Sequence, residues 1–240
     1  LNQVGLKPVI LHGAGPMLSE ALQKKKIEFS FIDGQRVTSL EVRDVAYSVF
    51  KETNKKIVDA LEAQGAKAKG LISNIFKCTM AHPDLGYVGS IESVDVNLVN
   101  EVLELDSIPV IAPVGFMGNE VLNINADIAT VELVKAINPY KAIFLSEIGG
   151  IFNKSGQLIT NINLALEYNE FMQEEWLHSG MKLKLEQIKS LLDDLPKTAS
   201  VSITEPINLP KELFTDSGSG TLIKYGYRVD RHQLPDKDIE

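Results

Sequence analysis

The stretch that decides the fold is PVILHGAGP, which covers residues 8–16. Three branched apolar residues, Val9 to Leu11, are followed by a turn of small residues, which predicts a buried strand of a parallel sheet. Residues 17–25 then carry apolar side chains at helical spacing. The turn therefore lies between a strand's carboxyl end and a helix's amino end, where open α/β sheets bind ligands. Glycine backbone and the helix dipole favour an anion there, although a tight turn without a ligand would show the same pattern.

The rest of the chain alternates strand and helix patterns. Asp33-Gly34 predicts a hairpin within residues 27–37, and Thr38 is expected to cap a long helix, with Glu41 completing a capping box. Further strands are expected within 71–94, 108–114, 141–146 and 198–204, and after the turn at 216–221. Further helices are expected at 96–105, from 121–127 to about 137, at 164–175 and at 179–195. This order favours a three-layer α/β/α sandwich with a mainly parallel central sheet.

Composition narrows the class of protein. The 240 residues are 44% hydrophobic, enough for one large α/β domain or two small lobes that share a sheet. A net charge of −8 without a basic run argues against nucleic acid and anionic membranes as partners. No apolar run reaches the ~18 residues that a membrane span needs. The single cysteine, Cys78, favours a reducing compartment and is expected in a core or strand position rather than as a nucleophile.

Small-residue turns occur at 12–15, 146–150 and 217–220. Several such turns on a parallel sheet suggest a phosphate-rich ligand that spans two sites. The chain lacks G-x-x-x-x-G-K-[ST] and a G-x-G-x-x-G after a strand, so neither a Walker loop nor a Rossmann site is predicted. It also lacks a Cys/His cluster with zinc spacing, and no protein metal site is predicted. His12 could bond the backbone of the first turn or touch a ligand.

Several single residues could carry chemistry, each beside a plainer structural explanation. Asp127 could anchor neighbouring groups or lie near Mg²⁺, but capping of a helix by Asn125 would explain this run as well. Lys182 and Lys184 begin another helix and could stabilise a phosphoryl group, or could lie on a solvated face. Arg36 could clamp a carboxylate through a two-pronged bond, or could be an exposed hairpin charge.

Six motifs, taken together and in this order, resemble one family. They are HGAGP (12–16), FIDGQRVTS (31–39), LNINAD (122–127), FLSEIGG (144–150), SGMKLK (179–184) and ELFTDSGSGT (212–221). They are similar to the amino acid kinase superfamily and, within it, to the N-acetylglutamate kinases of arginine biosynthesis. The similarity runs from about Leu1 to Val229, and SGMKLKLEQIKSLLDDLP (179–196) looks most like the fungal mitochondrial type.

The resemblance implies the amino acid kinase fold and transfer of a phosphoryl group from ATP with Mg²⁺ to the γ-carboxylate of N-acetyl-L-glutamate. It also implies feedback inhibition by arginine, a homo-oligomer, acetylglutamate synthase as a further partner, and the mitochondrial matrix as location. These are expectations from similarity and not from composition or spacing.

The resemblance assigns roles to individual residues as well. Lys184 would stabilise the transition state and Asp127 would orient the lysines. Six residues would hold the substrate: Gly13, Ala14, Gly15, Arg36, Asn123 and Asn125. Seven would border the nucleotide: Ser146, Glu147, Gly149, Gly150, Trp176, Leu177 and His178. Glu212 and Gly218 match the positions at which arginine-sensitive members bind the inhibitor.

Two departures from the family pattern matter. The family's Lys-x-Gly-Gly-type strand and the helix after it are expected upstream of Leu1, and the middle glycine of the usual H-G-G-G turn is Ala14. Alanine loses the freedom for positive φ but keeps its N–H, so we expect the change to be tolerated. Residues 1–229 are expected to form the kinase domain, and residues 230–240 a linker toward a C-terminal acetyltransferase-like domain.

Two other functions stay open at this point. One is a non-catalytic, arginine-sensing kinase-like domain of an N-acetylglutamate synthase. The other is a different kinase of the superfamily, acting on aspartate or carbamate, against which FIDGQRVT and ELFTDSGSGT argue.

Overall fold

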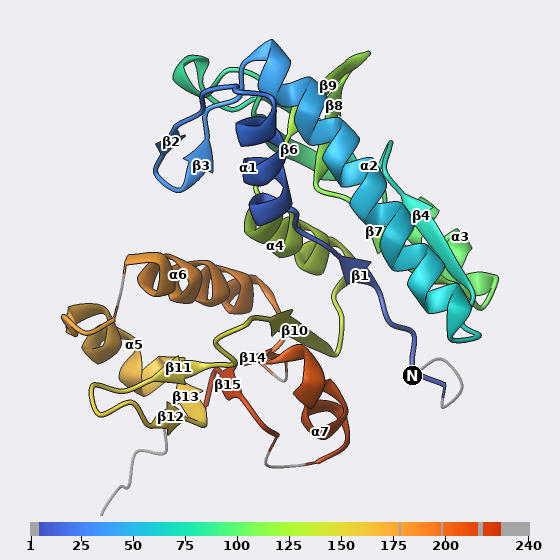
Figure 1. The fold of residues 1–240 in the computed structure, drawn as a ribbon. Helices are drawn as coiled ribbons and strands as arrows, with labels where there is room; N and C mark the ends of the chain where they lie inside the picture. Colours follow the sequence, from blue (N-terminus) through green and yellow to red (C-terminus); the bar gives the residue numbers. More distant parts are fainter. Residues whose placement is uncertain (1–4, 178, 198, 216–217, 227–240) are drawn as a thin grey trace, which may run out of the picture. The chain divides into compact units, whose positions relative to one another are not determined.

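The structure is a computed structural model that describes residues 5–177, 179–197, 199–215 and 218–226 (Figure 1). The chain divides into two compact units, Leu1–Ile137 and Asn138–Glu240. Each unit is described by itself. The expected linker at 230–240, and with it the domain boundary at 229, lies outside the described residues.

Unit 1 alternates strands and helices as the sequence predicts. Its elements are β1 (Ile10–Leu11), α1 (Gly15–Lys24), β2 (Phe31–Ile32), β3 (Gln35–Arg36), α2 (Leu40–Ala63), β4 (Ala68–Leu71), β5 (Phe76–Met80), β6 (Gly89–Val94), α3 (Val96–Glu104), β7 (Ile108–Ile111), β8 (Val114–Met117), β9 (Glu120–Asn123) and α4 (Ala126–Ile137). A short 3-10 helix, Pro83–Leu85, precedes β6.

The strands of unit 1 form a parallel sheet in the order β1-β7-β4 and a mixed sheet in the order β6-β5-β8-β9. All four residues of β7 are buried, as expected for a parallel strand covered on both faces. The hairpin β2–β3 turns through Asp33 and Gly34, both at positive φ, which confirms the Asp-Gly prediction.

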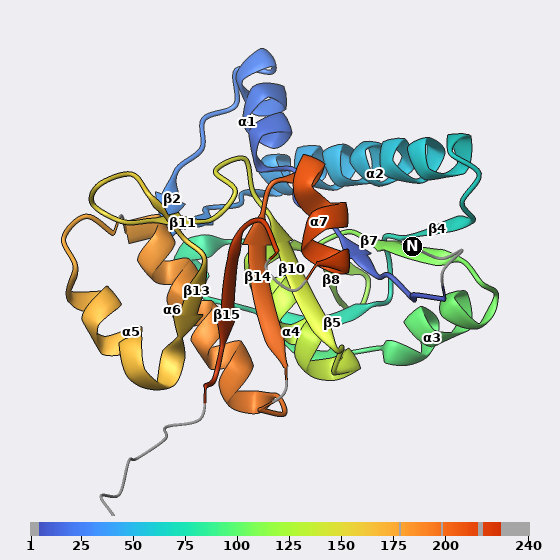
Figure 2. The same cartoon turned by 90° about the horizontal axis from the view of Figure 1, so that it is seen from below.

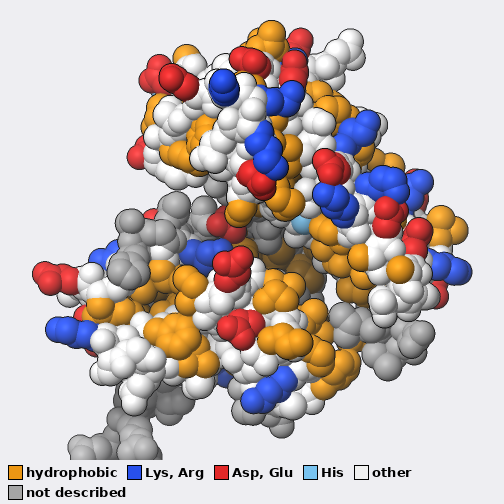
Figure 3. Space-filling view, in the orientation of Figure 1, with side chains coloured by type: hydrophobic (Ala, Val, Ile, Leu, Met, Phe, Trp, Pro, Cys, Tyr) orange, Lys and Arg blue, Asp and Glu red, His pale blue; other side chains and the backbone are white. Residues whose placement is uncertain are grey.

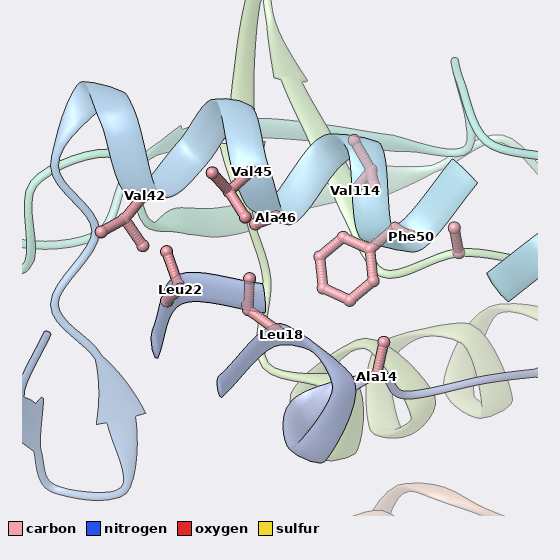
Figure 4. Close-up of a cluster of buried hydrophobic side chains, with 9 residues drawn as sticks. Ala14, Leu18, Leu22, Val42, Val45, Ala46, Phe50 and Val114 are labelled. Atoms are coloured by element: carbon pink, nitrogen blue, oxygen red, sulfur yellow. The ribbon is translucent and has the colours of Figure 1, made fainter. Parts of the chain in front are cut away.

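Helices cover both faces of these strands. One buried cluster joins α1 and α2 to Val114 through Leu18, Leu22, Val45 and Phe50 (Figure 4). A second cluster joins α3 and α4 to the strands, with its buried members at Ile75, Phe76, Cys78, Val99, Ile111, Leu122, Ile124, Ala129 and Leu133. Unit 1 therefore has the helix–sheet–helix layering that the alternation of patterns predicts.

Unit 2 contains β10 (Lys141–Leu145), β11 (Ile151–Phe152), β12 (Leu158–Ile159), β13 (Asn161–Asn163), α5 (Leu164–Gln173), α6 (Ser179–Asp194), β14 (Ser200–Thr204), a 3-10 helix (Pro206–Asn208), α7 (Leu209–Phe214) and β15 (Thr221–Lys224). Its sheet has the order β10-β14-β15-β13, in which β10–β14 and β13–β15 are parallel (Figure 2). Helices α6 and α7 both pack against β14. The core side of α6 consists of four fully buried residues: Leu185, Ile188, Leu191 and Leu192.

Three local predictions are wrong. The N-cap of α2 is Ser39, whose Oγ accepts from the Val42 N–H at 3.3 Å, so Thr38 does not cap and Glu41 lies one position too early for a capping box. Residues 108–114 form parts of two strands, because Pro113 has no N–H with which to continue the ladder. Residues 120–123 are strand β9 rather than the start of a helix, since a hairpin with Gly118 at positive φ pairs them with β8.

Cys78 lies buried in β5, as predicted, and burial raises the pKa of its thiol to about 11.

Lys/Arg and Asp/Glu side chains are interspersed on the surface that Figure 3 shows. In the part of the chain that the structure describes, no helix combines the length and the apolar character that a membrane crossing requires.

Candidate functional site

The first small-residue turn joins β1 to α1. Ala14 is the N-cap of α1, and alanine has no polar side chain with which to satisfy the first N–H groups of the helix. Pro16 follows in the first turn, which contains no acidic residue. The positive end of the helix dipole is therefore uncompensated by the helix's own side chains, which suits an anion. Ala14 has a φ of −149°, so alanine replaces glycine there without strain.

The first turn of α4 lies against this same turn. A Cβ built on Gly13 would lie 3.4 Å from the Cβ of Ala126. Asn125 Oδ1 accepts from the Asp127 N–H at 2.8 Å and the Ile128 N–H at 3.3 Å, so the structural explanation of Asn125 as a helix cap is confirmed. Two helix amino ends, with Asp127 in the first turn of one of them, thus meet at the predicted anion site.

Arg36 is buried, with 7% of its surface exposed, so an exposed hairpin charge is excluded. Its guanidinium carbon lies 4.3 Å from the ring centre of Phe29 and 4.6 Å from that of Phe31. Nη2 donates to Ser19 Oγ at 2.8 Å and to Gly15 O at 3.5 Å. Burial lowers the pKa of the Arg36 guanidinium from its ordinary value.

The other terminal nitrogen of Arg36, Nη1, is buried and has no hydrogen-bond partner among the described residues. A buried donor on a charged group is costly when it is unpaired. A carboxylate is the natural complement of a guanidinium, which presents parallel N–H groups to two oxygens. An anionic ligand would therefore supply the hydrogen-bond partner that Arg36 Nη1 lacks among the described residues.

A chain of hydrogen bonds connects Arg36 to Asn123. The Asn123 Nδ2 group donates to Thr38 Oγ1 at 3.1 Å, and that hydroxyl donates to Arg36 O at 2.7 Å. Thr38 is fully buried, and a Cβ on Gly86 would lie 2.4 Å from Thr38 O. Sequence reasoning missed Thr38 as a positioning residue, because a threonine just before a helix also has the pattern of an N-cap.

The second and third small-residue turns meet in unit 2. A Cβ on Gly220 would lie 3.0 Å from Gly149 O, and the Ile151 N–H donates to Thr221 Oγ1 at 2.8 Å. The Ser146 N–H donates to Thr204 O at 2.9 Å. These turns lie at the carboxyl ends of β10 and β14, where parallel strands bind ligands. The first turn belongs to unit 1, so a ligand that spans all three turns stays a prediction.

The two lysines of the SGMKLK motif have different surroundings. Lys182 Nζ donates to Met172 O at 2.9 Å, which ties α6 to the end of α5. Lys184 Nζ lies 5.1 Å from the ring centre of Phe144. Phe144 is near the carboxyl end of β10, two residues before Ser146. Of the pair, Lys184 is therefore the one that lies over the carboxyl end of β10.

The other residues expected around a nucleotide follow α5. Trp176 packs edge-on against Phe171, with 6.2 Å between the ring centres, and borders a surface groove together with Lys154 and Glu170. Leu177 is buried and contributes to the core. His178 lies outside the described residues.

Glu212 and Gly218, predicted as an inhibitor site, lie together. Glu212 is 4% exposed, and its Oε1 bonds Lys141 Nζ at 2.7 Å. Its Oε2 accepts from the Ser219 N–H at 3.0 Å, and a Cβ on Gly218 would lie 2.5 Å from the same oxygen. Burial alone would raise the pKa of the Glu212 carboxyl. The hydrogen bonds from Lys141 and Ser219 lower this pKa by more than burial raises it, so the pKa lies below its ordinary value. Sequence reasoning missed Lys141, because no pattern links residues this far apart.

Three relatives show where this chain stands among known proteins. The model of the amino acid kinase family matches residues 1–198. An acetylglutamate kinase of Xylella fastidiosa (strain Temecula1) is 46% identical over 96% of this chain and 55% of its own length. Protein arg11, mitochondrial, of Schizosaccharomyces pombe is 38% identical over 100% of this chain and 28% of its own length. An acetylglutamate kinase of Jannaschia sp. is 35% identical over 93% of this chain and 80% of its own length.

The chain thus spans about half the length, 54–55%, of three bacterial relatives that are 45–46% identical to it. Among solved structures, smu.665 of Streptococcus mutans has a TM-score of 0.81 at 23% identity, covering 94% of this chain and 89% of that one. An N-acetylglutamate synthase of Neisseria gonorrhoeae has a TM-score of 0.83 at 21% identity, covering 95% and 54%. At these identities the likeness establishes the fold, which confirms the predicted fold class.

Proposed function

Because the chain belongs to the amino acid kinase family, we propose that it transfers the γ-phosphoryl group of ATP to the γ-carboxylate of N-acetyl-L-glutamate. Relatives at 35–46% identity carry the name acetylglutamate kinase. The observation that carries the proposal is the buried Nη1 of Arg36, which has no hydrogen-bond partner among the described residues and calls for an anionic one. The product would be an acyl phosphate.

Arg36 would hold the α-carboxylate of the substrate through Nη1. The rings of Phe29 and Phe31 fix the plane of the guanidinium, and Ser19 takes up Nη2. Asn123, tied to Arg36 through Thr38, would face the acetamido group, since an amide recognises an amide by donating and accepting. The substrate would thereby be held through both its α-carboxylate and its acetamido group.

The γ-carboxylate would then lie at the turn formed by Gly13, Ala14 and Gly15. One of its oxygens attacks the γ-phosphorus while the bond to the β–γ bridging oxygen breaks, and ADP leaves. A carboxylate is ionised at neutral pH, so the step needs neither a protein nucleophile nor a general base. The protein's part is to place N–H groups and cations where charge spreads over the phosphoryl oxygens.

By the family resemblance, Lys184 would supply that charge and Asp127 would orient the cationic groups. The turns at 146–150 and 217–220 would cradle the nucleotide phosphates, with Trp176, Leu177 and His178 at its border. Within the described residues no three carboxylate, histidine or cysteine side chains gather as a metal centre. Mg²⁺ would accordingly be held mainly by the ATP phosphates, whose charge it neutralises.

Regulation by arginine is the second part of the proposal. The buried Glu212 carboxylate already takes a cation, Lys141, and hydrogen-bonds the backbone beside Gly218. A carboxylate of this kind suits the guanidinium of free arginine, which would have to displace Lys141. A homo-oligomer and an interaction with acetylglutamate synthase remain proposals by similarity. The mitochondrial matrix rests on relatives at 37–40% identity whose names include the word mitochondrial, whereas the relatives at 45–46% identity are bacterial.

A non-catalytic domain of an N-acetylglutamate synthase is the less favoured alternative. The kinase name belongs to relatives at up to 46% identity, whereas the solved synthases are 20–21% identical and share the fold. Carbamate kinase of Giardia is more distant still, at 12–13%.

ADP release with a panel of acceptors tests the proposal. The protein with its natural flanking residues would be given MgATP and N-acetyl-L-glutamate, glutamate, N-acetyl-aspartate, aspartate or carbamate. We expect turnover with N-acetyl-L-glutamate and a loss of about 10²–10³-fold in kcat for Lys184→Met. Lys182→Met is the matched control and should retain turnover, because Lys182 bonds Met172 O instead. Equal loss in both variants, or no turnover with N-acetyl-L-glutamate, would contradict the proposal.

A further inference from the structure

A buried polar chain runs beneath the glycine turn and has no part in the function proposed above. His12 is 7% exposed and Asn54, in the middle of α2, is 3% exposed. Asn54 Nδ2 lies 2.9 Å from Val110 O and 3.2 Å from His12 Nε2. His12 Nδ1 lies 3.4 Å from Gly13 O. The chain therefore reaches from the central strand β7 to the first residue of the turn.

The partners fix which atom donates at each step. Val110 O accepts only, so the Asn54 atom that faces it is the amide nitrogen, a donor. That nitrogen also faces His12 Nε2, which must accept and so carries no proton. A neutral imidazole then has its proton on Nδ1, the nitrogen that faces Gly13 O. Burial lowers the pKa of His12, which keeps the ring neutral.

The orientation of Gly13 O decides the orientation of the next N–H. The described residues contain no cis peptide bond, and in a planar trans peptide the C=O and the N–H point in opposite directions. When His12 holds Gly13 O on the side of the imidazole, the N–H of Ala14 points away from it. Ala14 is the N-cap residue at the amino end of α1, where the anion is expected.

We propose that His12 and Asn54 are positioning residues that hold the Gly13–Ala14 peptide so that the Ala14 N–H faces the reacting anion. This inference rests on the proposed phosphoryl transfer. Neither side chain touches the substrate: Asn54 fixes the tautomer of His12, and His12 fixes the peptide. An oriented backbone donor that needs no reorganisation during the reaction is among the more effective ways to stabilise developing charge.

The Asn54 amide packs directly against Gly70 of β4. A Cβ on Gly70 would lie 2.2 Å from Asn54 Oδ1, so β4 presents a glycine where the amide passes. His12 is also held by its own backbone, whose N–H donates to Ile111 O at 3.1 Å. The turn is thus attached to β7 twice, once through the backbone and once through the side chains.

Two substitutions of His12 separate a positioning role from simple core filling. His12→Asn places an amide nitrogen where Nδ1 lies and can still donate to Gly13 O. His12→Gln places its amide near Nε2 and leaves Gly13 O without that donor. We expect His12→Gln to lower kcat about 10–100-fold with little change in KM for either substrate. His12→Asn should stay within about threefold of the natural enzyme in kcat.

The tautomer of His12 gives a readout that does not depend on activity. In ¹⁵N-histidine NMR of the full protein, assigned by the signal that His12→Asn removes, we expect the Nδ1–H form. Asn54→Leu removes the donor to Nε2, and we expect the signal to shift toward the Nε2–H form while kcat falls. A Nε2–H tautomer in the natural protein, or equal kcat in folded His12→Asn and His12→Gln, would overturn the inference. If the natural protein shows no turnover at all, the proposed function fails, and the NMR result still decides the hydrogen-bond assignment.

Discussion

At the residue scale, the burial of Arg36 decides between the two explanations that its sequence position allows, an exposed hairpin charge and a residue that binds a carboxylate. Its guanidinium lies between Phe29 and Phe31 with Nη1 unpaired among the described residues. Lysine would keep the charge but lose the planar fork. We therefore predict that Arg36→Lys raises KM for N-acetyl-L-glutamate about 10–100-fold and leaves KM for ATP nearly unchanged.

Arg43→Lys is the matched control, because Arg43 bonds Asp44 and Glu120 on the surface of unit 1. Steady-state kinetics with each substrate varied in turn would measure both effects. An equal rise of KM for the acceptor in the two variants would argue against a carboxylate at Arg36.

His12 carries a pH prediction at the same scale. Because burial lowers its folded-state pKa, the unfolded chain binds the proton more readily between that pKa and the ordinary value of 6.5. The stability that His12 contributes is thus fully present above pH 6.5 and is lost as the pH falls below it. Urea unfolding from pH 8 to 5 should show a smaller loss in His12→Asn than in the natural protein. Parallel pH profiles would contradict a neutral buried histidine.

At the element scale, β5 and β8 approach so closely that a small pair of residues is needed. A Cβ on Gly115 would lie 2.4 Å from Cys78 Sγ. We predict that Gly115→Ala destabilises the fold by about 1–3 kcal/mol, because the core is already filled. Removing the sulfur with Cys78→Ala should recover part of that loss in the double variant. Urea unfolding of all four proteins measures the coupling, and strictly additive free energies would show that the two residues do not interact.

Ser39 offers a second prediction for an element. Its Oγ is the observed cap of α2, so Ser39→Ala should lower the free energy of unfolding by about 1 kcal/mol. Thr38→Ser keeps the hydroxyl that links Arg36 to Asn123 and serves as the neighbouring control. Thermal unfolding measures both, and a Ser39→Ala variant as stable as the natural protein would contradict Ser39 as the cap.

Elements were predictable wherever local pattern decides them. The 3.6-residue repeats gave α2, α3 and α6, and Asp33-Gly34 gave the β2–β3 hairpin. The strand β9 was not predictable, because its pairing with β8 decides between two readings of residues 120–123. The surroundings of Arg36 and Glu212 were equally hidden, since Ser19 and Lys141 reach them through tertiary packing. The residue types at the site could be named from motifs, but their partners depend on the fold.

For the whole molecule, we predict that the two substrates leave separate footprints on the two units. N-acetyl-L-glutamate should slow amide exchange at 13–18 and 35–39, whereas a non-hydrolysable ATP analogue should slow it at 146–151 and 219–222. Peptides from α3 serve as the control, because no proposed ligand touches that helix. Hydrogen exchange with mass spectrometry measures all of these together. Protection of 146–151 and 219–222 by N-acetyl-L-glutamate in place of 13–18 and 35–39 would contradict the proposed assignment of the ligands.

The most direct test of the central claim is to trap the acyl phosphate with hydroxylamine. The protein with its natural flanking residues would be incubated with MgATP and N-acetyl-L-glutamate, with and without arginine. We predict the γ-hydroxamate of N-acetylglutamate, identified by mass spectrometry, only when both substrates are present, and less of it when arginine is added. Absence of the hydroxamate, with arginine still raising the melting temperature, would contradict a kinase and leave an arginine-binding domain.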